Sequence, residues 1–170
     1  MAHGPYNVLF LCTGNSARSI IAEALLNRFG EGRFQAFSAG SHPKGQAHPL
    51  ALRLLQERGL PTDGLRSKSW NEFAVAGAPS MDLVVTVCDN AAGEVCPVWP
   101  GQPTTVHWSF QDPAAVEGTE TERLRAFEQV ARELEARIRL LAGLRLDELD
   151  RDNLKRRLNR MHPGGTEEEQ

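Results

Sequence analysis

One short stretch, VLFLCTGNSARS at residues 8–19, constrains the fold more than any other part of the chain. It begins with an apolar run that is typical of a buried parallel strand, and the run stops at Cys12. The seven residues that follow, TGNSARS, are small apart from Arg18, and residues 20–29 then repeat apolar side chains at helical spacing. The stretch therefore predicts a strand, a loop of small residues and a helix in immediate succession.

The rest of the chain alternates strand-like and helix-like segments in the same manner. The predicted strands are residues 6–11, 34–39, 81–87 and 104–108, and the predicted helices are residues 17–29, 49–58, 119–142 and 146–161. Such alternation indicates an α/β fold, which we expect to be a three-layer domain with a four-stranded parallel sheet flanked by helices. We expect this domain to occupy residues 1–145, with a C-terminal helix and a disordered acidic tail over residues 146–170.

The two predicted helices nearest the C-terminus carry further signals. Thr119 and Glu122 form a candidate capping box at the start of the long helix. Its apolar residues recur at steps of three and four, which fits a coiled coil, but the run is short and one stripe packed on the sheet is the better interpretation. The final helix has a basic side made of Arg151, Lys155, Arg156, Arg157 and Arg160. We interpret that side as a solvated face, and we expect the helix to cover an edge of the fold.

Composition and charge exclude several classes of protein. With 41% hydrophobic and 24% charged residues, the chain of 170 residues is typical of a globular domain. A net charge of −3 argues against a protein that binds nucleic acid through overall basicity. No apolar stretch approaches membrane-spanning length, and the first residues lack the features of a signal peptide. We therefore expect a cytoplasmic protein that binds neither nucleic acid nor a membrane.

The loop after the first strand has the properties of an anion site. Ligands of parallel sheets bind beyond the carboxyl ends of the strands, and a helix N-terminus offers free amide groups and partial positive charge. Gly14 permits a positive φ and close approach of the backbone, and Arg18 offers a fork of donors that suits a tetrahedral oxyanion. The predicted oxyanion-binding residues are Thr13, Gly14, Asn15, Ser16, Ala17 and Arg18.

Cys12 lies in the same electrostatic environment as the expected anion. A thiol at a helix N-terminus beside a guanidinium has its thiolate stabilised, and the hydroxyl of Ser19 could add a hydrogen bond. A thiolate beside a bound oxyanion is a nucleophile beside its electrophile. A Cys followed six residues later by an Arg is only moderately specific, but its position between a strand and a helix favours catalysis over a buried structural cysteine.

Three residues far along the chain complete the candidate site. Cys88 ends the predicted third strand, as Cys12 ends the first, and seven residues separate Cys88 from Cys96. An odd number of cysteines argues against a disulfide framework, and zinc is weakly supported because His107 is the nearest candidate for a fourth ligand. A thiol relay fits these cysteines better. Asp112 precedes a proline, which is common in turns, but near an oxyanion its carboxyl could donate a proton.

Several segments carry a resemblance to a known family. CTGNSARS resembles the active-site loop of the low-molecular-weight tyrosine phosphatase superfamily. The other matching segments are FSAG at 37–40, RSKSW at 66–70, VVTVCD at 84–89 and HWSFQDPA at 107–114. Together with the Cys96-Pro97 pair they resemble the thioredoxin-coupled arsenate reductases of that superfamily, over about residues 6–142. The resemblance implies a low-molecular-weight phosphatase-like fold and arsenate as the substrate, with phosphate and sulfate as competing oxyanions.

The resemblance also implies a sequence of steps. Cys12 attacks arsenate that is held by the loop and by Arg18, while Asp112 protonates the departing oxygen. Cys88 then attacks Cys12, which releases arsenite and leaves a disulfide between the two cysteines. Cys96 attacks Cys88, and thioredoxin reduces the resulting Cys88–Cys96 disulfide. The thiols thus supply the two electrons that the arsenic takes up.

The chain departs from this family in three places. Asn15, Glu23 and Ser38 match ligands of a potassium ion in some relatives, whereas Lys68 stands where a carboxylate assists, so that its charge could replace the ion. The last two cysteines are one residue further apart than usual, and Ala17 stands where many relatives have a cysteine outside the relay. Neither of these changes removes a relay residue. We expect no tightly bound cofactor, with potassium as an open question.

Two other functions remain open. A low-molecular-weight phosphatase would use the same loop and the same acid to hydrolyse phosphomonoesters, but it needs neither Cys88 nor Cys96. Such phosphatases typically carry aromatic residues after their Asp-Pro pair, whereas small residues follow it here. A binding module that senses an oxyanion would have no use for three aligned thiols. The paired cysteines favour thioredoxin as the electron donor without excluding glutaredoxin with a small thiol.

Overall fold

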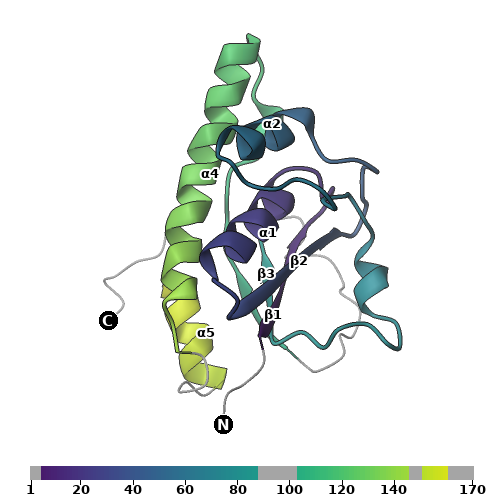
Figure 1. Ribbon diagram of the computed structural model, residues 1–170, viewed down its shortest axis with the longest axis vertical. Helices are drawn as coiled ribbons and strands as arrows, with labels where there is room; N and C mark the ends of the chain where they lie inside the picture. Colours follow the sequence, from purple (N-terminus) through teal and green to yellow (C-terminus); the bar gives the residue numbers. More distant parts are fainter. Residues whose placement is uncertain (1–4, 88–102, 146–150, 161–170) are drawn as a thin grey trace.

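The computed structural model describes residues 5–87, 103–145 and 151–160, and it places four parallel strands in one sheet (Figure 1). The strands are β1 (Tyr6–Cys12), β2 (Phe34–Gly40), β3 (Leu83–Thr86) and β4 (Thr104–His107), and their order in the sheet is β2-β1-β3-β4. Cys12, the last residue of the central strand β1, pairs with Gly40, the last residue of the edge strand β2. Because all four strands are parallel, their carboxyl ends meet at one edge of the sheet.

Strands β3 and β4 are shorter than the sequence predicts. Val87 and Trp108 were expected to end them, yet each lies one position beyond its strand. Both still donate a hydrogen bond to the sheet: Val87 N donates to Leu11 O at 2.8 Å, and Trp108 N donates to Thr86 O at 2.8 Å. Their apolar side chains are fully buried, which explains why the sequence pattern includes them in the strands.

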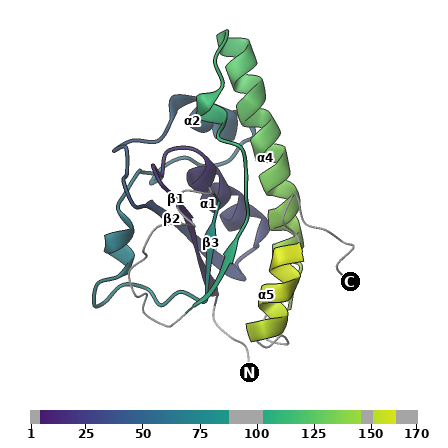
Figure 2. The ribbon, with the colours of Figure 1, turned by 180° about the vertical axis from the view of Figure 1, so that it is seen from behind.

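The described α-helices pack on one face of the sheet, and the short 3₁₀ helix η1 (Trp70–Phe73) packs on the other. The α-helices are α1 (Arg18–Phe29), α2 (Pro49–Glu57), α4 (Glu120–Ala142) and α5 (Arg151–Arg160), and a second short 3₁₀ helix is η2 (Pro113–Ala115). Val8 and Phe10 of β1 belong to the larger core, which the helices α1, α2 and α4 also build. Leu9 and Leu11 point to the opposite face and pack with Phe73 of η1. The predicted sheet flanked by helices is therefore confirmed (Figure 2).

Helix α4 begins as the sequence predicts. Thr119 Oγ1 accepts a hydrogen bond from Glu122 N at 3.1 Å, and Glu122 Oε1 accepts one from Thr119 N at 2.8 Å, which confirms the capping box. The buried stripe of the helix consists of Phe127, Val130, Ala131, Leu134, Ile138, Leu141 and Ala142. This stripe packs into the chain's own core against α1, as expected for one stripe packed on the domain rather than for a coiled coil.

Helix α5 packs beside the edge strand β4. Leu154 and Leu158 are buried, and the indole Nε1 of Trp108 donates a hydrogen bond to Leu158 O at 3.0 Å. The described part of the basic side, Lys155, Arg156 and Arg157, is exposed, as expected for a solvated face. The predicted helix residues 146–150, residue 161 and the acidic tail lie outside the described residues. Among the helices that the structure describes, none combines the length and the apolar character that crossing a bilayer requires.

Candidate active site

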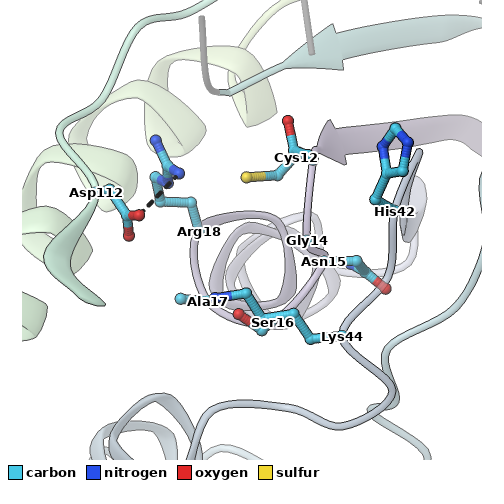
Figure 3. A pocket seen from close by; sticks show the side chains of 10 residues that line it. Cys12, Gly14, Asn15, Ser16, Ala17, Arg18, His42, Lys44 and Asp112 are labelled. Carbon is cyan, nitrogen blue, oxygen red and sulfur yellow. Dashed lines mark ion pairs between the residues drawn. The ribbon is translucent and has the colours of Figure 1, made fainter. Parts of the chain in front are cut away.

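The described residues form a pocket at the carboxyl end of β1. The lining combines the predicted nucleophile and all six residues of the predicted anion loop with three residues from elsewhere in the chain (Figure 3). The lining residues are Cys12, Thr13, Gly14, Asn15, Ser16, Ala17, Arg18, His42, Lys44 and Asp112. The structure therefore places the predicted nucleophile, every predicted oxyanion-binding residue and the predicted proton donor around one cavity.

The backbone of the loop is attached to residues 41–48, which we call the rim segment. The carbonyls of Thr13 and Gly14 accept hydrogen bonds from His42 N and Lys44 N, both at 2.9 Å, and Ser16 O accepts one from His48 N at 2.8 Å. These three carbonyl oxygens, each the negative end of a peptide dipole, are therefore hydrogen-bonded to another part of the chain before an anion enters. The loop can then offer its amide groups to the anion.

The N-cap residue of α1 has no side chain that could satisfy the amide groups at the start of the helix. Ala17 is the N-cap residue, and its methyl group cannot accept a hydrogen bond as Ser, Thr, Asp or Asn would. The first amides of a helix have no acceptor within the helix, so an oxyanion in the pocket can take the place of a cap. The unusual cap residue thus supports the predicted anion site.

Asn15 holds the loop in its curved conformation. Its φ of 45° lies in the left-handed region, which residues other than glycine rarely adopt. The buried side chain offsets this strain with three hydrogen bonds: Nδ2 donates to Ser19 Oγ at 2.8 Å and to Ser38 Oγ at 3.0 Å, and Oδ1 accepts from Lys68 N at 2.8 Å. Ser19, which the sequence places beside the thiolate, does not line the pocket; in the described contacts its hydroxyl supports Asn15.

Cys12, Arg18 and Asp112, the predicted reacting groups within the described residues, lie around the same pocket. Cys12 is buried, with 5% of its surface exposed, and Figure 3 shows its sulfur directed toward the side chain of Arg18. The Arg18 guanidinium donates from Nη1 to Phe110 O at 2.9 Å, and its Nη2 lies 3.6 Å from Asp112 Oδ2. Arg18 Nε is buried and has no hydrogen-bond partner among the described residues. An oxyanion in the pocket would provide the acceptor that such a buried donor requires.

Asp112 occupies the side of the pocket opposite the rim segment. It is the N-cap residue of η2, where Oδ1 accepts a hydrogen bond from Ala114 N at 3.0 Å. The proline that follows keeps its backbone extended, at a ψ of 108°, in agreement with the expected turn. Its side chain is 43% exposed, so its carboxyl can reach both the pocket and water.

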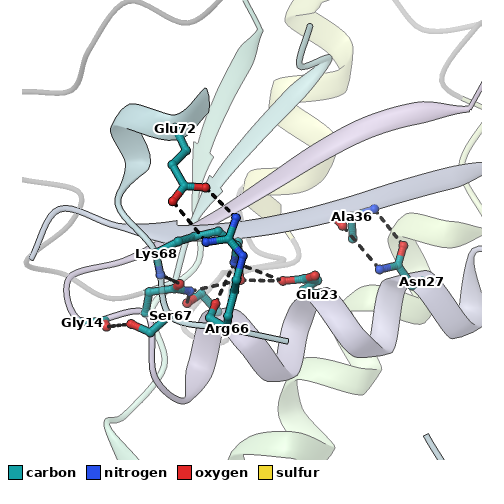
Figure 4. A network of polar contacts seen from close by, with 11 residues as sticks. Gly14, Glu23, Asn27, Ala36, Arg66, Ser67, Lys68 and Glu72 are labelled. Carbon is teal, nitrogen blue, oxygen red and sulfur yellow. Dashed lines mark hydrogen bonds and ion pairs between the residues drawn. The ribbon is translucent and has the colours of Figure 1, made fainter. Parts of the chain in front are cut away.

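A polar cluster around Glu23 and Lys68 lies behind the loop (Figure 4), and neither residue lines the pocket. Ser38 Oγ donates to Glu23 Oε1 at 2.6 Å, and the Lys68 ammonium lies 3.9 Å from the same oxygen, donates to Arg66 O at 2.8 Å and contacts Ser38 Oγ at 3.5 Å. Burial raises the pKa of Glu23, while the Ser38 hydrogen bond and the charge of Lys68 oppose the rise. Burial lowers the pKa of Lys68, and Glu23 opposes that change. The three residues matched to a potassium site thus lie around a lysine.

Sequence reasoning missed two pocket residues, His42 and Lys44. Both follow Gly40, the last residue of β2, and therefore begin at the same edge of the sheet as Cys12. That position was the available signal, because loops after neighbouring parallel strands share one edge. Neither residue belongs to the strand, loop and helix pattern that drew attention to residues 8–19.

Cys88 and Cys96 lie outside the described residues. The last described residue before them is Val87, whose amide donates to Leu11 O at 2.8 Å, next to Cys12 in the sequence. His107, considered as a metal ligand, lies in β4 with Nδ1 at 2.7 Å from Thr86 Oγ1.

Comparison with known proteins identifies the family of this chain. The model of the family described as low molecular weight phosphotyrosine protein phosphatase matches residues 7–156. The arsenate reductase of Halalkalibacterium halodurans is 37% identical over 135 residues, which are 79% of this chain and 94% of that protein. The crystal structure of arsenate reductase from Archaeoglobus fulgidus has a TM-score of 0.63 and 31% identity, and the match covers 81% of this chain and 99% of that one.

The description of a further similar solved structure names a redox partner of that protein. The thioredoxin-dependent arsenate reductase of Corynebacterium glutamicum is 31% identical with a TM-score of 0.56, and the match covers 83% of this chain and 65% of that one. The family model spans most of the chain, and the curated relative is matched over nearly its whole length. The chain therefore belongs to the low molecular weight phosphotyrosine protein phosphatase family, and within it to the arsenate reductases.

Proposed function

We propose that the protein reduces arsenate to arsenite through a covalent intermediate on Cys12. The observation that carries this proposal is the convergence of Cys12, Arg18 and Asp112 on one pocket at the N-terminus of α1. A buried sulfur, a guanidinium with a buried free Nε and a carboxyl are the nucleophile, the anion holder and the acid that such a reaction needs.

The first step is a displacement at arsenic. Arsenate binds to the loop amides and to the fork of Arg18, which positions the arsenic atom in front of Cys12 Sγ. The thiolate forms a bond between sulfur and arsenic, and one oxygen leaves as water after it takes the proton of the Asp112 carboxyl. Arg18 lies between both groups in Figure 3, so it can hold the anion while Asp112 reaches the departing oxygen.

The second step transfers the electrons. The thiolate of Cys88 attacks Cys12 Sγ, the bond between sulfur and arsenic breaks, and its electron pair stays on arsenic, which leaves as arsenite. The thiolate of Cys96 then attacks Cys88, which frees Cys12 and forms the Cys88–Cys96 disulfide. The hydrogen bond between Val87 N and Leu11 O supports this relay, because each of these residues directly precedes one of the first two reacting cysteines.

We propose thioredoxin as the electron donor and the cytoplasm as the site of the reaction. The C. glutamicum relative is described as thioredoxin-dependent, and a pair of nearby cysteines suits exchange with a dithiol protein. The relay also requires a compartment in which thiols are kept reduced. Glutaredoxin with a small thiol is the alternative donor that the experiment below includes.

Lys68 replaces a potassium ion in this proposal. Its ammonium already lies close to Glu23 and Ser38, two of the residues that match potassium ligands, and it therefore supplies a positive charge behind the loop. Turnover should then be equal in sodium and potassium buffers of the same ionic strength. A clear requirement for potassium would contradict this part of the proposal.

The test of the main proposal is reconstituted turnover. Purified protein with arsenate, thioredoxin, thioredoxin reductase and NADPH should consume NADPH, and a parallel assay should use glutaredoxin with glutathione. Cys12→Ser and Cys88→Ser should each abolish steady turnover. If Cys88→Ser keeps the full rate, the relay is wrong.

A phosphatase is the second candidate function, because phosphate and arsenate have nearly the same shape and the loop and Asp112 serve both. Ala114, Ala115 and Val116 follow the acid and its proline, so no aromatic side chain stands there to bind a phosphorylated tyrosine. Hydrolysis of an aryl phosphate needs no relay cysteine. Cys88→Ser should therefore leave any such hydrolysis intact while it stops arsenate reduction.

A further inference from the structure

The rim segment gives the pocket a second cationic side chain, Lys44, at a well-defined position. Its amide donates to Gly14 O, and the next residue, Gly45, has a φ of 96° that favours glycine. Gly45 N donates to Ser67 Oγ at 3.1 Å, and Ser67 Oγ donates to Gly14 O at 3.2 Å (Figure 4). The backbone of Lys44 is thus attached to the anion loop both directly and through Ser67.

The side chain of Lys44 follows the anion loop closely. A methyl group added at Gly14 would lie 3.2 Å from Lys44 Cε and 3.3 Å from Lys44 Cγ, so the lysine stem passes directly over this glycine. In Figure 3 the side chain continues along the pocket toward Ser16. Pro43, which precedes it, restricts the backbone of the rim segment further. The ammonium therefore lies along the wall of the pocket.

The charges of the pocket make this position important. Among the charged lining residues, Arg18 lies 3.6 Å from Asp112 and also donates to Phe110 O. No ion pair joins Lys44 to another residue of the described part of the chain. Arsenate or phosphate near neutral pH carries up to two negative charges, and it must bind beside a thiolate. One guanidinium, which also donates to Phe110 O, leaves much of that charge uncompensated.

We propose that Lys44 is a substrate-binding residue whose ammonium helps to hold the divalent oxyanion in the pocket. The proposal rests on the proposed function in so far as arsenate is the oxyanion that reacts. Lys44 comes from the rim segment and not from the anion loop, and it lies on the other side of the loop from the proton donor. Its charge therefore stabilises the bound anion before and during the attack by similar amounts, which changes KM rather than kcat.

Two substitutions separate the charge of Lys44 from the packing of its stem. Lys44→Met keeps an unbranched apolar chain over Gly14 and removes the charge, whereas Lys44→Arg keeps the charge. Lys155→Gln is the matched control, because Lys155 is exposed on α5, far from the pocket at the other end of the domain (Figure 1). All three proteins should have the same melting temperature as the wild type within about 3 °C, an interval that corresponds to about 1 kcal/mol or less.

The expected effect is on anion affinity. At low ionic strength, Lys44→Met should raise KM for arsenate and the inhibition constant of phosphate by about three- to tenfold, the range for one partly exposed charge contact, with kcat within about twofold. Lys44→Arg should recover most of the affinity, and Lys155→Gln should match the wild type. The difference between wild type and Lys44→Met should shrink at about 0.5 M salt, where screening is strong.

A second measurement needs no turnover. Inorganic phosphate should protect Cys12 from iodoacetamide, as read by mass spectrometry of the peptide that contains Cys12, and Lys44→Met should need about three- to tenfold more phosphate for half protection. If the wild type reduces no arsenate but phosphate still protects Cys12 through Lys44, the proposed function fails while this inference stands. The inference is overturned if wild type and Lys44→Met need the same phosphate concentration for half protection of Cys12. It is also overturned if Lys44→Met and Lys44→Arg lose the same amount of phosphate affinity.

Discussion

The two sides of the pocket are built in different ways. On one side, Asn15 is fully buried with three side-chain hydrogen bonds, and three loop carbonyls are bonded to the rim segment. On the other side, Asp112 is 43% exposed and stands before a 3₁₀ helix of only three residues. Arg18 lies between them, with 14% of its side chain exposed.

This difference matches the tasks of the two sides. An anion cradle must hold backbone dipoles in one geometry, because their value depends on orientation that is set before the substrate arrives. A proton donor must change its partner during the reaction, since it gives up a proton and later regains one from water. The loop side is therefore rigid and buried, and the acid side is held by few contacts. The following four predictions test this comparison.

Arg18 serves both sides, so its loss should have the largest effect. Arg18→Lys keeps the charge but loses the fork of donors, and we expect kcat/KM for arsenate to fall on the order of 10³-fold. Protection of Cys12 by phosphate should weaken in the same variant. Circular dichroism should show an unchanged fold. A fall of less than about tenfold would mean that positive charge alone, without the geometry of the guanidinium, is sufficient.

The acid side should affect rate without affecting stability. Asp112→Asn removes the proton donor, while the amide oxygen can still accept the hydrogen bond from Ala114 N, because Asn and Asp are equivalent N-caps. We expect kcat to fall on the order of 10²-fold, with the melting temperature and phosphate affinity nearly unchanged. Rapid mixing and thermal unfolding measure the two quantities. A large loss of stability would contradict the view that this side is loosely held.

The loop side should affect stability first. Asn15→Ala removes three buried hydrogen bonds and leaves a left-handed φ without glycine, so we expect the free energy of unfolding to fall by about 2–4 kcal/mol. Asn15→Gly is the matched control, because it removes the same bonds but accepts the positive φ. Its loss, measured by urea unfolding, should be smaller. Equal losses in the two variants would show that backbone strain contributes little.

The polar cluster behind the loop should produce the smallest effect, visible as a pH dependence. Burial raises the pKa of Glu23 above its ordinary value of 4.5, so the folded protein binds this proton more tightly than the unfolded chain does. Stability should therefore fall as pH rises from about 4.5 through the raised pKa of the folded state, and this contribution should be constant above it. Urea unfolding at several pH values should show this fall in the free energy of unfolding of the wild type but not of Glu23→Gln. If the free energies of both proteins change with pH in parallel, the prediction is wrong.

Much of the fold and part of the site could be predicted from the sequence because the signals are local. The apolar run before Cys12, the small residues after it and the helical spacing that follows each depend on near neighbours, and the capping box joins residues three positions apart. The predicted ends of strands β3 and β4 were less accurate. Val87 and Trp108 continue the hydrogen bonds of the sheet beyond the strands, and a sequence pattern cannot distinguish such flanking residues from strand residues.

The sequence by itself determined that a cysteine, a loop of small residues and an arginine stand between a strand and a helix. Asp112 was predicted to lie near the oxyanion, but only the tertiary structure decided the contacts: Asp112 and Phe110 O lie beside Arg18, Lys68 behind Asn15, and Lys44 over Gly14. The physical reason is the strand order β2-β1-β3-β4, which selects the segments that adjoin the end of β1. That order arises from packing between distant parts of the chain, and no local pattern of residues encodes it.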